Sequence, residues 1–431
     1  MRLLRLAPIA LLALGCEKTD VADAPGDAPT WNGEIAEIVG DNCAGCHVDG
    51  DIAPFGLNTY AEASSVAGLI ASVVEAGTMP PWQAGDDCRD YEGDFSMTES
   101  EKALLLAWVE GGSPEGDGQP REAIGPEVVQ QELDVTLSMP EPYIPTGEAP
   151  DDYRCVVLDW PETEAGYVTG FEVLPDSREQ VHHVLAYKGL PEDAQMFYDW
   201  DEAEPGLGYT CYGAPTGPGG RATTQLLGGW APGIRTAGFP EGTGLYVEPG
   251  SVVILQMHYN TSATNPVADE TQISFAFTDQ VEREAVSTLV TEPLWTLGTT
   301  MEIPAGEASV VHESSVDLPF FLSVSESGFD LAPDEALELH ALGMHMHQLG
   351  RRGRVSLQKA DGSEACLVDI PNWDFNWQGR FQLAETVLVE PGDKIHIECE
   401  WDNSGPDAVD TYWGDGTSDE MCLSGMYLSR L

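Results

Sequence analysis

Basic residues are scarce in this chain. Its 431 residues include 19 Lys and Arg against 73 Asp and Glu, a formal net charge of -54. Nucleic-acid binding requires clusters of Lys and Arg around the phosphates, so this composition argues against a nucleic-acid partner. An acidic surface of this kind suits solvation at high salt, and it could also dock a basic redox partner protein through complementary fields.

Long hydrophobic runs are also missing. The longest, Leu6–Leu14, is too short to span a bilayer, but it follows two arginines and precedes Gly15 and Cys16. This pattern predicts a secretory signal over 1–15, lipid attachment at Cys16 and an acidic tether over 16–29. Cleavage by signal peptidase I nearby is the alternative. We therefore expect an exported lipoprotein, facing the periplasm or the cell surface, that meets the membrane only through this lipid.

Cysteine is sparse but informative. If Cys16 carries lipid and two cysteines belong to the haem motif described below, six of the nine remain. Export implies an oxidising compartment, in which these six can form disulfides, although the sequence leaves their pairing open. They are Cys88, Cys155, Cys211, Cys366, Cys399 and Cys422.

The chain divides by pattern into a helical part and a strand-rich part. Apolar periodicity predicts helices within 30–117, one of them starting at a capping box formed by Thr98 and Glu101. A linker follows at 118–128. Beyond it, short Val-, Thr- and Tyr-rich runs separated by turn residues predict two antiparallel β-sandwich domains. We place these domains at 129–284 and 285–431, so the fold class is mainly β with an N-terminal all-α domain.

The helical part contains a haem-attachment motif. Cys43-Ala-Gly-Cys46-His47 offers two thiols for the haem vinyl groups and a histidine as the proximal iron ligand. Met79, held before two prolines, is the expected sixth ligand, and Met97 is the second candidate. The motif predicts one c-type haem in a cytochrome c-like domain. The alternative is a disulfide loop beside an incidental histidine.

Five histidines of the strand-rich part fall into three tight motifs. A His-x-His strand places two imidazoles on one face, where they can share a metal, whereas adjacent histidines on a strand need a bulge to do so. Imidazole ligands suit copper or zinc. Of the other histidines, His340 could orient a ligand, and His312 and His396 are expected to be structural. The motif residues are His182, His183, His258, His345 and His347.

These motifs, together with the segment from Trp413 to Cys422, resemble the copper type II ascorbate-dependent monooxygenases, typified by peptidylglycine α-hydroxylating monooxygenase and dopamine β-monooxygenase. The resemblance covers about residues 130–431. It implies two jelly-roll-like sandwiches that face each other across a solvent cleft, each holding one copper ion. A thioether on the second copper favours Cu(I).

The resemblance also implies roles for individual residues. Gln256 would be a catalytic residue in the cleft, together with Met421, and Cys399–Cys422 would be a disulfide. The electron-storing copper would be held by His182, His183 and His258. The copper at which dioxygen reacts would be held by His345, His347 and Met421.

The chain departs from the peptide-amidating member of the family at its substrate anchor. Gly343 stands where an arginine would precede the His-x-His strand, and Leu423 and Gly425 follow Met421, so a peptide C-terminus is not the expected substrate. The basic cluster of Arg351, Arg352 and Arg354 leaves a candidate anion site.

Together these features predict an exported haem- and copper-containing monooxygenase. It would hydroxylate a C–H bond of a small organic substrate with O2, using electrons that pass from the haem to the two coppers. The alternative functions are a non-enzymatic electron-transfer or copper-binding lipoprotein, and a module whose sites hold zinc or no metal.

Overall fold

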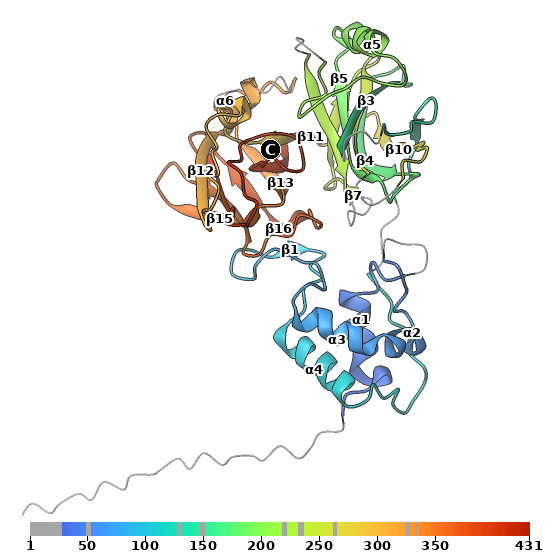
Figure 1. The fold of residues 1–431 in the computed structure, drawn as a ribbon. Coiled ribbons are helices and arrows are strands. Elements are labelled where there is room, and N and C mark those ends of the chain that lie inside the picture. The colour runs from blue at the N-terminus through green and yellow to red at the C-terminus, as the bar shows by residue number, and fades with distance from the viewer. Residues whose placement is uncertain are drawn as a thin grey trace, which may run out of the picture.

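The protein is mainly β, with a helical N-terminal part (Figure 1). The computed structural model describes residues 28–48, 53–126, 131–146, 151–217, 222–231, 237–261, 265–324, 328–332 and 334–431. The predicted signal, Cys16 and most of the acidic tether lie outside the described residues. Among the described helices, none is both long enough and apolar enough to cross a membrane.

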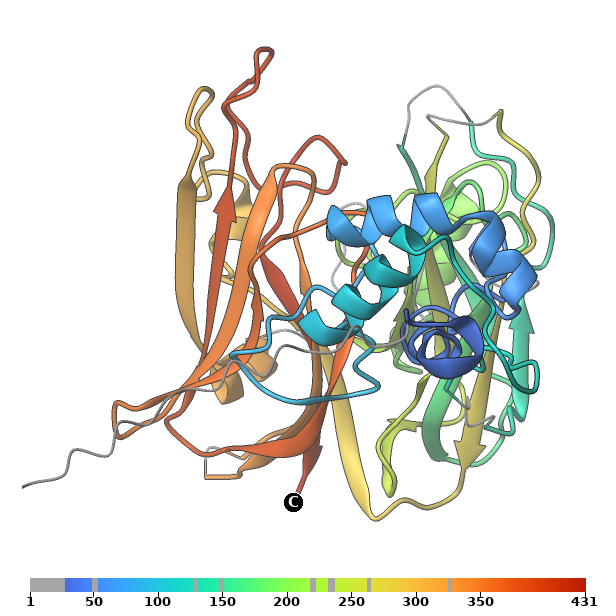
Figure 2. The same cartoon turned by 90° about the horizontal axis from the view of Figure 1, so that it is seen from below.

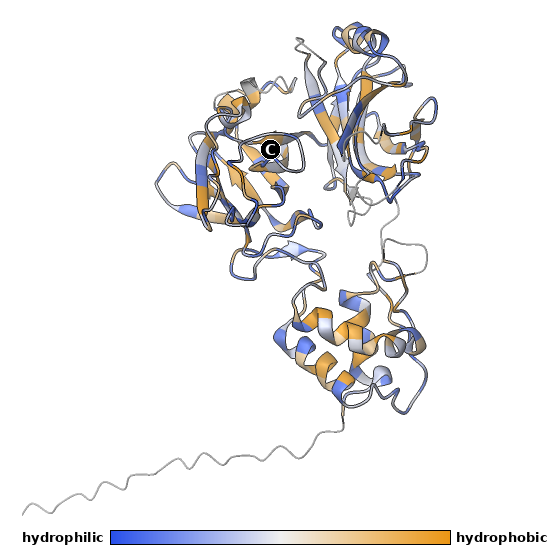
Figure 3. Cartoon of the chain, in the orientation of Figure 1, coloured by the Kyte–Doolittle hydropathy of each residue, from blue (hydrophilic) through white to orange (hydrophobic). Residues whose placement is uncertain are grey.

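The helical part contains η1 (Trp31–Ile35), α1 (Ala36–Asn42), α2 (Tyr60–Ser65), α3 (Ala67–Glu75) and α4 (Glu99–Glu110). Helix α4 begins at the capping box that the sequence predicts, and α2 begins at a second one formed by Thr59 and Glu62. Trp31 and Trp108 are fully buried between the helices, where apolar residues gather in Figure 3. Local capping and burial of these rings account for the helical fold here.

The strand-rich part begins with a nine-strand unit, which also carries the helix α5 (Ala194–Ala203). Along β9, a run of eight buried residues lies at the centre of a four-stranded sheet of order β3-β9-β5-β6. The strands are β2 (Val135–Ser138), β3 (Asp151–Asp159), β4 (Gly166–Leu174), β5 (Val181–Gly189), β6 (Thr224–Trp230), β7 (Ala237–Gly238), β8 (Thr243–Val247), β9 (Val252–Asn260) and β10 (Gln272–Thr278).

The second strand-rich unit packs a four-stranded sheet of order β12-β17-β14-β15 against the larger sheet. It also contains η2 (Trp295–Leu297) and α6 (Leu318–Val324). Its strands are β11 (Arg283–Val290), β12 (Val310–Asp317), β13 (Leu337–His345), β14 (Gly350–Gln358), β15 (Glu364–Ile370), β16 (Arg380–Val389), β17 (Lys394–Trp401) and β18 (Leu423–Arg430).

One ten-stranded sheet runs through both sandwiches in the order β1-β16-β13-β18-β11-β8-β4-β10-β2, with β7 paired to β4. The units meet where β8 and β11 pair in parallel. The predicted boundary between residues 284 and 285 falls inside β11, which pairs with β8 on one side and β18 on the other. Shared backbone hydrogen bonds therefore fix the two sandwiches relative to each other.

The helical part reaches into the second sandwich through β1 (Tyr91–Glu92), which pairs with β16 at the edge of the large sheet. A disulfide between Cys88 and Cys366, with an S–S distance of 2.05 Å, joins the same segment to β15. Figure 2 shows the helices at one end of the two sandwiches, across the junction between them.

Candidate metal centres and haem site

His182, His183 and His258 come together between β5 and β9. The register of these two strands shifts between Val181 and His183, which is the bulge that adjacent histidines need to converge on one point. One ring nitrogen from each histidine lies within 4.8 Å of the others. The sequence-predicted cluster is therefore assembled by the fold.

The chemistry of this cluster fits a metal ion. The Nδ1 atoms of His183 and His258 are 3.3 Å apart, and His182 Nδ1 is buried without a hydrogen-bond partner. Burial lowers the pKa of His182 to about 4, helped by repulsion from His258, and burial also lowers the pKa of His183. Neutral imidazoles with lone pairs directed at one another form a ligand set for copper or zinc.

Asp151 on β3 orients one of these ligands. Its Oδ1 accepts a hydrogen bond from His258 Nε2 at 2.9 Å and from the Thr417 hydroxyl at 2.8 Å. Burial opposes ionisation of Asp151, but the hydrogen bonds outweigh it and lower the pKa of this carboxyl to about 2. A carboxylate on the far nitrogen fixes the histidine tautomer that leaves Nδ1 free for a metal.

His345 at the end of β13 and His347 just beyond it form the second cluster. Their ring centroids are 5.0 Å apart at an interplanar angle of 90°. His345 Nδ1 donates to Gln378 Oε1 at 2.5 Å, and His347 Nδ1 donates to the Asp419 carbonyl at 3.0 Å. Burial lowers the pKa of His345 to about 3 and that of His347 to about 4. Both rings are thus neutral, with Nε2 available as the ligand atom.

Met421 lies on a loop that is tied to this second cluster. The neighbouring Glu420 is fully buried, and its carboxylate accepts hydrogen bonds from the backbone N–H groups of His347 (2.9 Å) and Leu349 (2.6 Å). The structure contains the Cys399–Cys422 disulfide that the resemblance implies, with an S–S distance of 2.09 Å. These contacts hold Met421, which is 8% exposed, beside the His-x-His segment.

Phe375 contacts both clusters. The Phe375 ring centroid lies 5.1 Å from that of His182 and 6.0 Å from that of His347. Asp151 adds a second link by accepting from Thr417, and Tyr153 adds a third because its hydroxyl donates to the Asp415 carbonyl at 2.7 Å. No sequence motif singles out Asp151 or Phe375, because their roles depend on contacts between distant segments.

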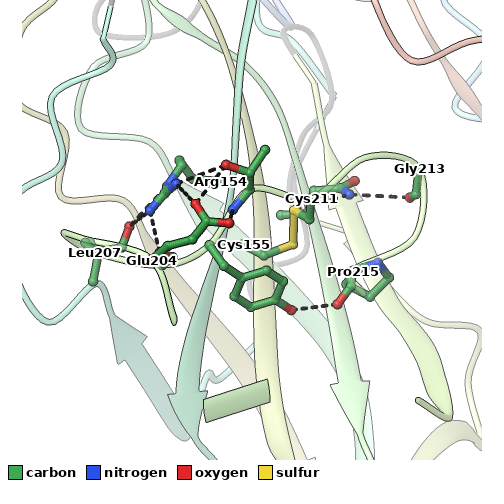
Figure 4. The surroundings of a disulfide bond; sticks show 11 residues. Arg154, Cys155, Glu204, Leu207, Cys211, Gly213 and Pro215 are labelled. Atoms are coloured by element: carbon green, nitrogen blue, oxygen red, sulfur yellow. Dashed lines mark hydrogen bonds and ion pairs between the residues drawn. A yellow bond between two sulfur atoms is a disulfide. The ribbon is translucent and has the colours of Figure 1, made fainter. Parts of the chain in front are cut away.

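Gln256, predicted to act in the cleft, lies beside a disulfide. It is 2% exposed, and its amide donates to the Gly213 carbonyl at 3.4 Å beside the disulfide between Cys155 and Cys211 (Figure 4). Gln256 shares a strand face with His258, two residues on. Its catalytic role stays a prediction.

The haem motif lies at a large cavity. His47 Nδ1 donates to the Phe55 carbonyl at 3.1 Å, which leaves Nε2 as the atom that could bind iron. Cys43, Cys46, His47 and Met79 all line a cavity of about 1850 Å³ that continues to His182 and Phe375. Met97, the second candidate ligand, is 7% exposed and belongs to the helical core. The described geometry therefore favours Met79.

The basic cluster after the His-x-His motif offers no free anion site. Arg351 contacts Asp402 at 3.7 Å, Arg352 contacts Asp369 at 3.0 Å, and Arg354 contacts Glu364 at 3.3 Å. The chain's own carboxylates thus occupy these guanidinium groups. The remaining histidines have polar partners: His340 with Ser429, His312 with the Glu302 carbonyl, and His396 with Ser315.

Comparison with known proteins matches both sandwiches to one family. Residues 135–266 match the copper type II ascorbate-dependent monooxygenase N-terminal domain, and residues 312–429 match the C-terminal domain. DBH-like monooxygenase protein 2 of Mus musculus is 25% identical over 285 residues, 63% of this chain and 42% of that protein. MOXD1 homolog 2 of Drosophila melanogaster is 23% identical over 263 residues, 58% of this chain and 33% of that protein.

The chain therefore spans less than half of the length of these relatives. Among solved structures, the major capsid protein P2 of bacteriophage PM2 matches with a TM-score of 0.25 at 9% identity, covering 69% of this chain and 98% of that one. Similarity at that level carries no argument about this protein.

Two β-sandwich domains, each with a cluster of neutral histidines, together with the two matching domain signatures are typical of copper-dependent monooxygenases. The chain belongs to the copper type II ascorbate-dependent monooxygenase family, whose two domain signatures together match more than half of its residues.

Proposed function

We propose that the protein is an exported monooxygenase that hydroxylates a C–H bond of a small organic substrate with O2, and that a c-type haem in the same chain supplies the electrons. The observation that carries the proposal is the pair of histidine clusters that both contact Phe375. Bound copper would supply the redox and dioxygen chemistry at these clusters.

The chain's own residues hold and orient the ligand sets. His182, His183 and His258 present Nδ1 atoms to a first copper, and Asp151 holds His258 in the matching tautomer. His345 and His347 present Nε2 atoms to a second copper, because their Nδ1 atoms are bound to Gln378 and the Asp419 carbonyl. Met421 would add a thioether to the second set, which suits copper and not zinc.

The contacts of the segment after Met79 support electron delivery from the haem. This segment is anchored to β15 by the disulfide Cys88–Cys366, by a hydrogen bond from Gly85 N to the Asp369 carbonyl (2.8 Å) and by one from the Tyr91 hydroxyl to the Leu367 carbonyl (2.9 Å). A covalently fastened haem domain does not need to diffuse to its acceptor, so transfer within the chain is favoured.

An aromatic contact extends the same route. Trp82, three residues after Met79, lies with its ring centroid 5.3 Å from that of Phe381 on β16. Both rings line the cavity that connects His47 and Met79 to His182. The candidate haem ligands and His182 of the first histidine cluster therefore line one cavity, which supports an internal donor in place of a soluble reductant. A basic redox partner protein that reduces the haem again after each transfer fits the net charge of -54.

Export is supported by three disulfides, which persist in oxidising compartments. We propose that Cys16 carries the lipid that anchors the protein to a membrane, with residues 17–29 as the tether. Cys16→Ser should release the protein from the membrane fraction while leaving its metal content unchanged. Continued membrane retention of that variant would rule out the lipid anchor.

The test of the copper assignment is metal stoichiometry. Protein loaded with haem, reconstituted with copper and desalted should retain two coppers per haem by elemental analysis. Met421→Ala should lose one copper and oxygen-dependent product formation, while the haem spectrum stays intact. Met426→Leu, a change at a buried methionine of β18, is the matched control and should retain both coppers.

Three outcomes would contradict the proposal. Absence of retained copper, or a preference for zinc, would reduce the sandwiches to a binding module. Full activity of Met421→Ala would contradict the second ligand set. Two coppers without oxygen uptake coupled to any substrate would favour the alternative, an electron-transfer or copper-holding protein.

A further inference from the structure

Arg380, the first residue of β16, carries a guanidinium group that no carboxylate among the described residues compensates. Across the described part of the chain it makes no hydrogen bond or ion pair, and its buried Nη2 is unpartnered. The rings of Tyr427 and Phe239 lie beside it, with centroids 5.5 and 5.9 Å from Cζ. Aromatic faces stabilise a cation only partly, so an anion is the missing partner.

Several other arginines show how readily this chain supplies such partners. Arg154 pairs with Glu204 at 2.9 Å, Arg283 pairs with Glu338, and Arg352 pairs with Asp369 at 3.0 Å. A guanidinium nitrogen that is shielded from water and unpaired carries a desolvation cost that a carboxylate would offset, and the chain has 73 acidic residues. An arginine left unpaired among so many acids indicates a position kept open for a ligand.

The position of Arg380 connects this opening to the second histidine cluster. Its Cα pairs across β13 and β16 with Gly343, two residues before His345. Gln378, two residues before Arg380, accepts the hydrogen bond from His345 Nδ1. A group held by Arg380 would therefore lie beside β13, the strand that carries His345.

The surrounding cavity suits an apolar molecule with one charged end. Arg380 lines the same cavity as Phe239, Phe375 and Phe381, which form apolar walls. Nearby acidic groups do not compete for it: Glu338 is engaged by Arg283, and Glu241 makes no ion pair with Arg380 within the described residues. The site therefore combines aromatic walls with one available cation.

We propose that Arg380 anchors a carboxylate, and that the substrate is an organic acid with an apolar or aromatic body. This inference rests on the proposed function for its substrate but not for its anion site. A haem propionate offers the same carboxylate chemistry, because the cavity continues to His47 and Met79. The strand pairing of Arg380 with Gly343 favours the substrate over the propionate.

The test compares binding of benzoate with its neutral analogue benzamide, by calorimetry on the haem- and copper-loaded protein. We expect benzoate to bind about 10-fold or more tightly, as a charge-assisted bidentate pair would give. Arg380→Gln should abolish the preference. Arg351→Gln, a change at an exposed arginine that faces Asp402, is the matched control and should keep it.

A second variant guards against misfolding. Arg380→Lys keeps the positive charge but loses the planar guanidinium that donates two parallel hydrogen bonds. This variant should therefore retain a weakened preference for benzoate. In parallel, the haem potential is measured against pH. If wild-type protein shows no benzoate preference but the inflection in this profile moves to higher pH in Arg380→Gln, and not in Arg351→Gln, the carboxylate is a haem propionate.

If wild-type protein shows no benzoate preference and Arg380→Gln shows no displaced inflection, the anion site is overturned. Because binding is measured without turnover, this failure is distinguishable from failure of the copper assignment, which appears as missing metal.

Discussion

Phe375 stacks on His182, with the two ring planes 21° apart and the ring centroids 5.1 Å apart. The same Phe375 ring makes an edge contact with His347, and these two ring centroids are 6.0 Å apart. One aromatic side chain of the second sandwich thus contacts both candidate ligand sets. Contact between the sandwiches, and not only the ligands within each, defines the site.

Replacing this ring should uncouple the two sets without emptying them. We expect Phe375→Leu to retain two coppers but to lower substrate-coupled oxygen uptake, by up to about 100-fold if the sandwiches shift by about an ångström. Oxygen-electrode rates and elemental analysis measure the two quantities. Phe320→Leu, on an exposed face of α6, is the control. Unchanged oxygen uptake in Phe375→Leu would show that the ring only fills space between the two sandwiches.

Removing the carboxylate behind His258 should weaken the first copper selectively. Asp151→Asn keeps the shape and an acceptor oxygen but loses the charge that His258 Nε2 faces. Loss of such an outer partner lowers metal affinity by about 10- to 100-fold. In a chelator titration, this variant should release one copper at a lower chelator concentration than wild type does. The other copper should leave at the same chelator concentration as in wild type. Simultaneous release of both, or of neither, would contradict the assignment.

Opening the disulfide that fastens the helical part, the proposed haem domain, should free it from the sandwiches. We expect Cys88→Ser with Cys366→Ser to lower the free energy of unfolding by about 2–4 kcal/mol and to slow copper reduction by the reduced haem. The haem spectrum should not change. Denaturant titration and stopped-flow absorbance report the two effects. A reduction rate equal to that of wild type would mean that β1 alone keeps the domain docked.

Acid should destabilise the metal-free protein. Burial is the main cause that lowers the pKa of His340 to about 4, below the ordinary histidine value of 6.5. As pH falls below about 6.5 the unfolded chain takes up a proton that the folded chain refuses until about pH 4, so stability present above pH 6.5 is lost in that window.

For His340 this linkage amounts to about 1.4 kcal/mol per pH unit within the window. His340→Gln should flatten the dependence of unfolding free energy on pH between 6.5 and 4, measured by urea titration. A slope equal to that of wild type would place the acid sensitivity elsewhere.

Much of the architecture follows from local patterns. Alternating or continuous apolar runs at 167–173, 181–187, 251–259 and 394–401 predict β4, β5, β9 and β17 close to their observed bounds, and the capping box at Thr98 predicts the start of α4. The bulge that brings His182 and His183 together is required by the geometry of adjacent residues on a strand, and it is present. Periodicity and short-range geometry are properties of sequence, so these features are readable without a structure.

The sequence by itself determined the ligand types, the family, the mainly β class and the Cys399–Cys422 pairing that the family implies. Only the tertiary structure decided that Phe375 lies between the two histidine clusters, that Asp151 orients His258, and that Arg380 Nη2 has no hydrogen-bond partner among the described residues. It also decided that β8 and β11 join the sandwiches into one sheet. The reason is physical: each of these features depends on which distant strands pair and in which register, and register is set by packing of the whole core rather than by any local run of residues.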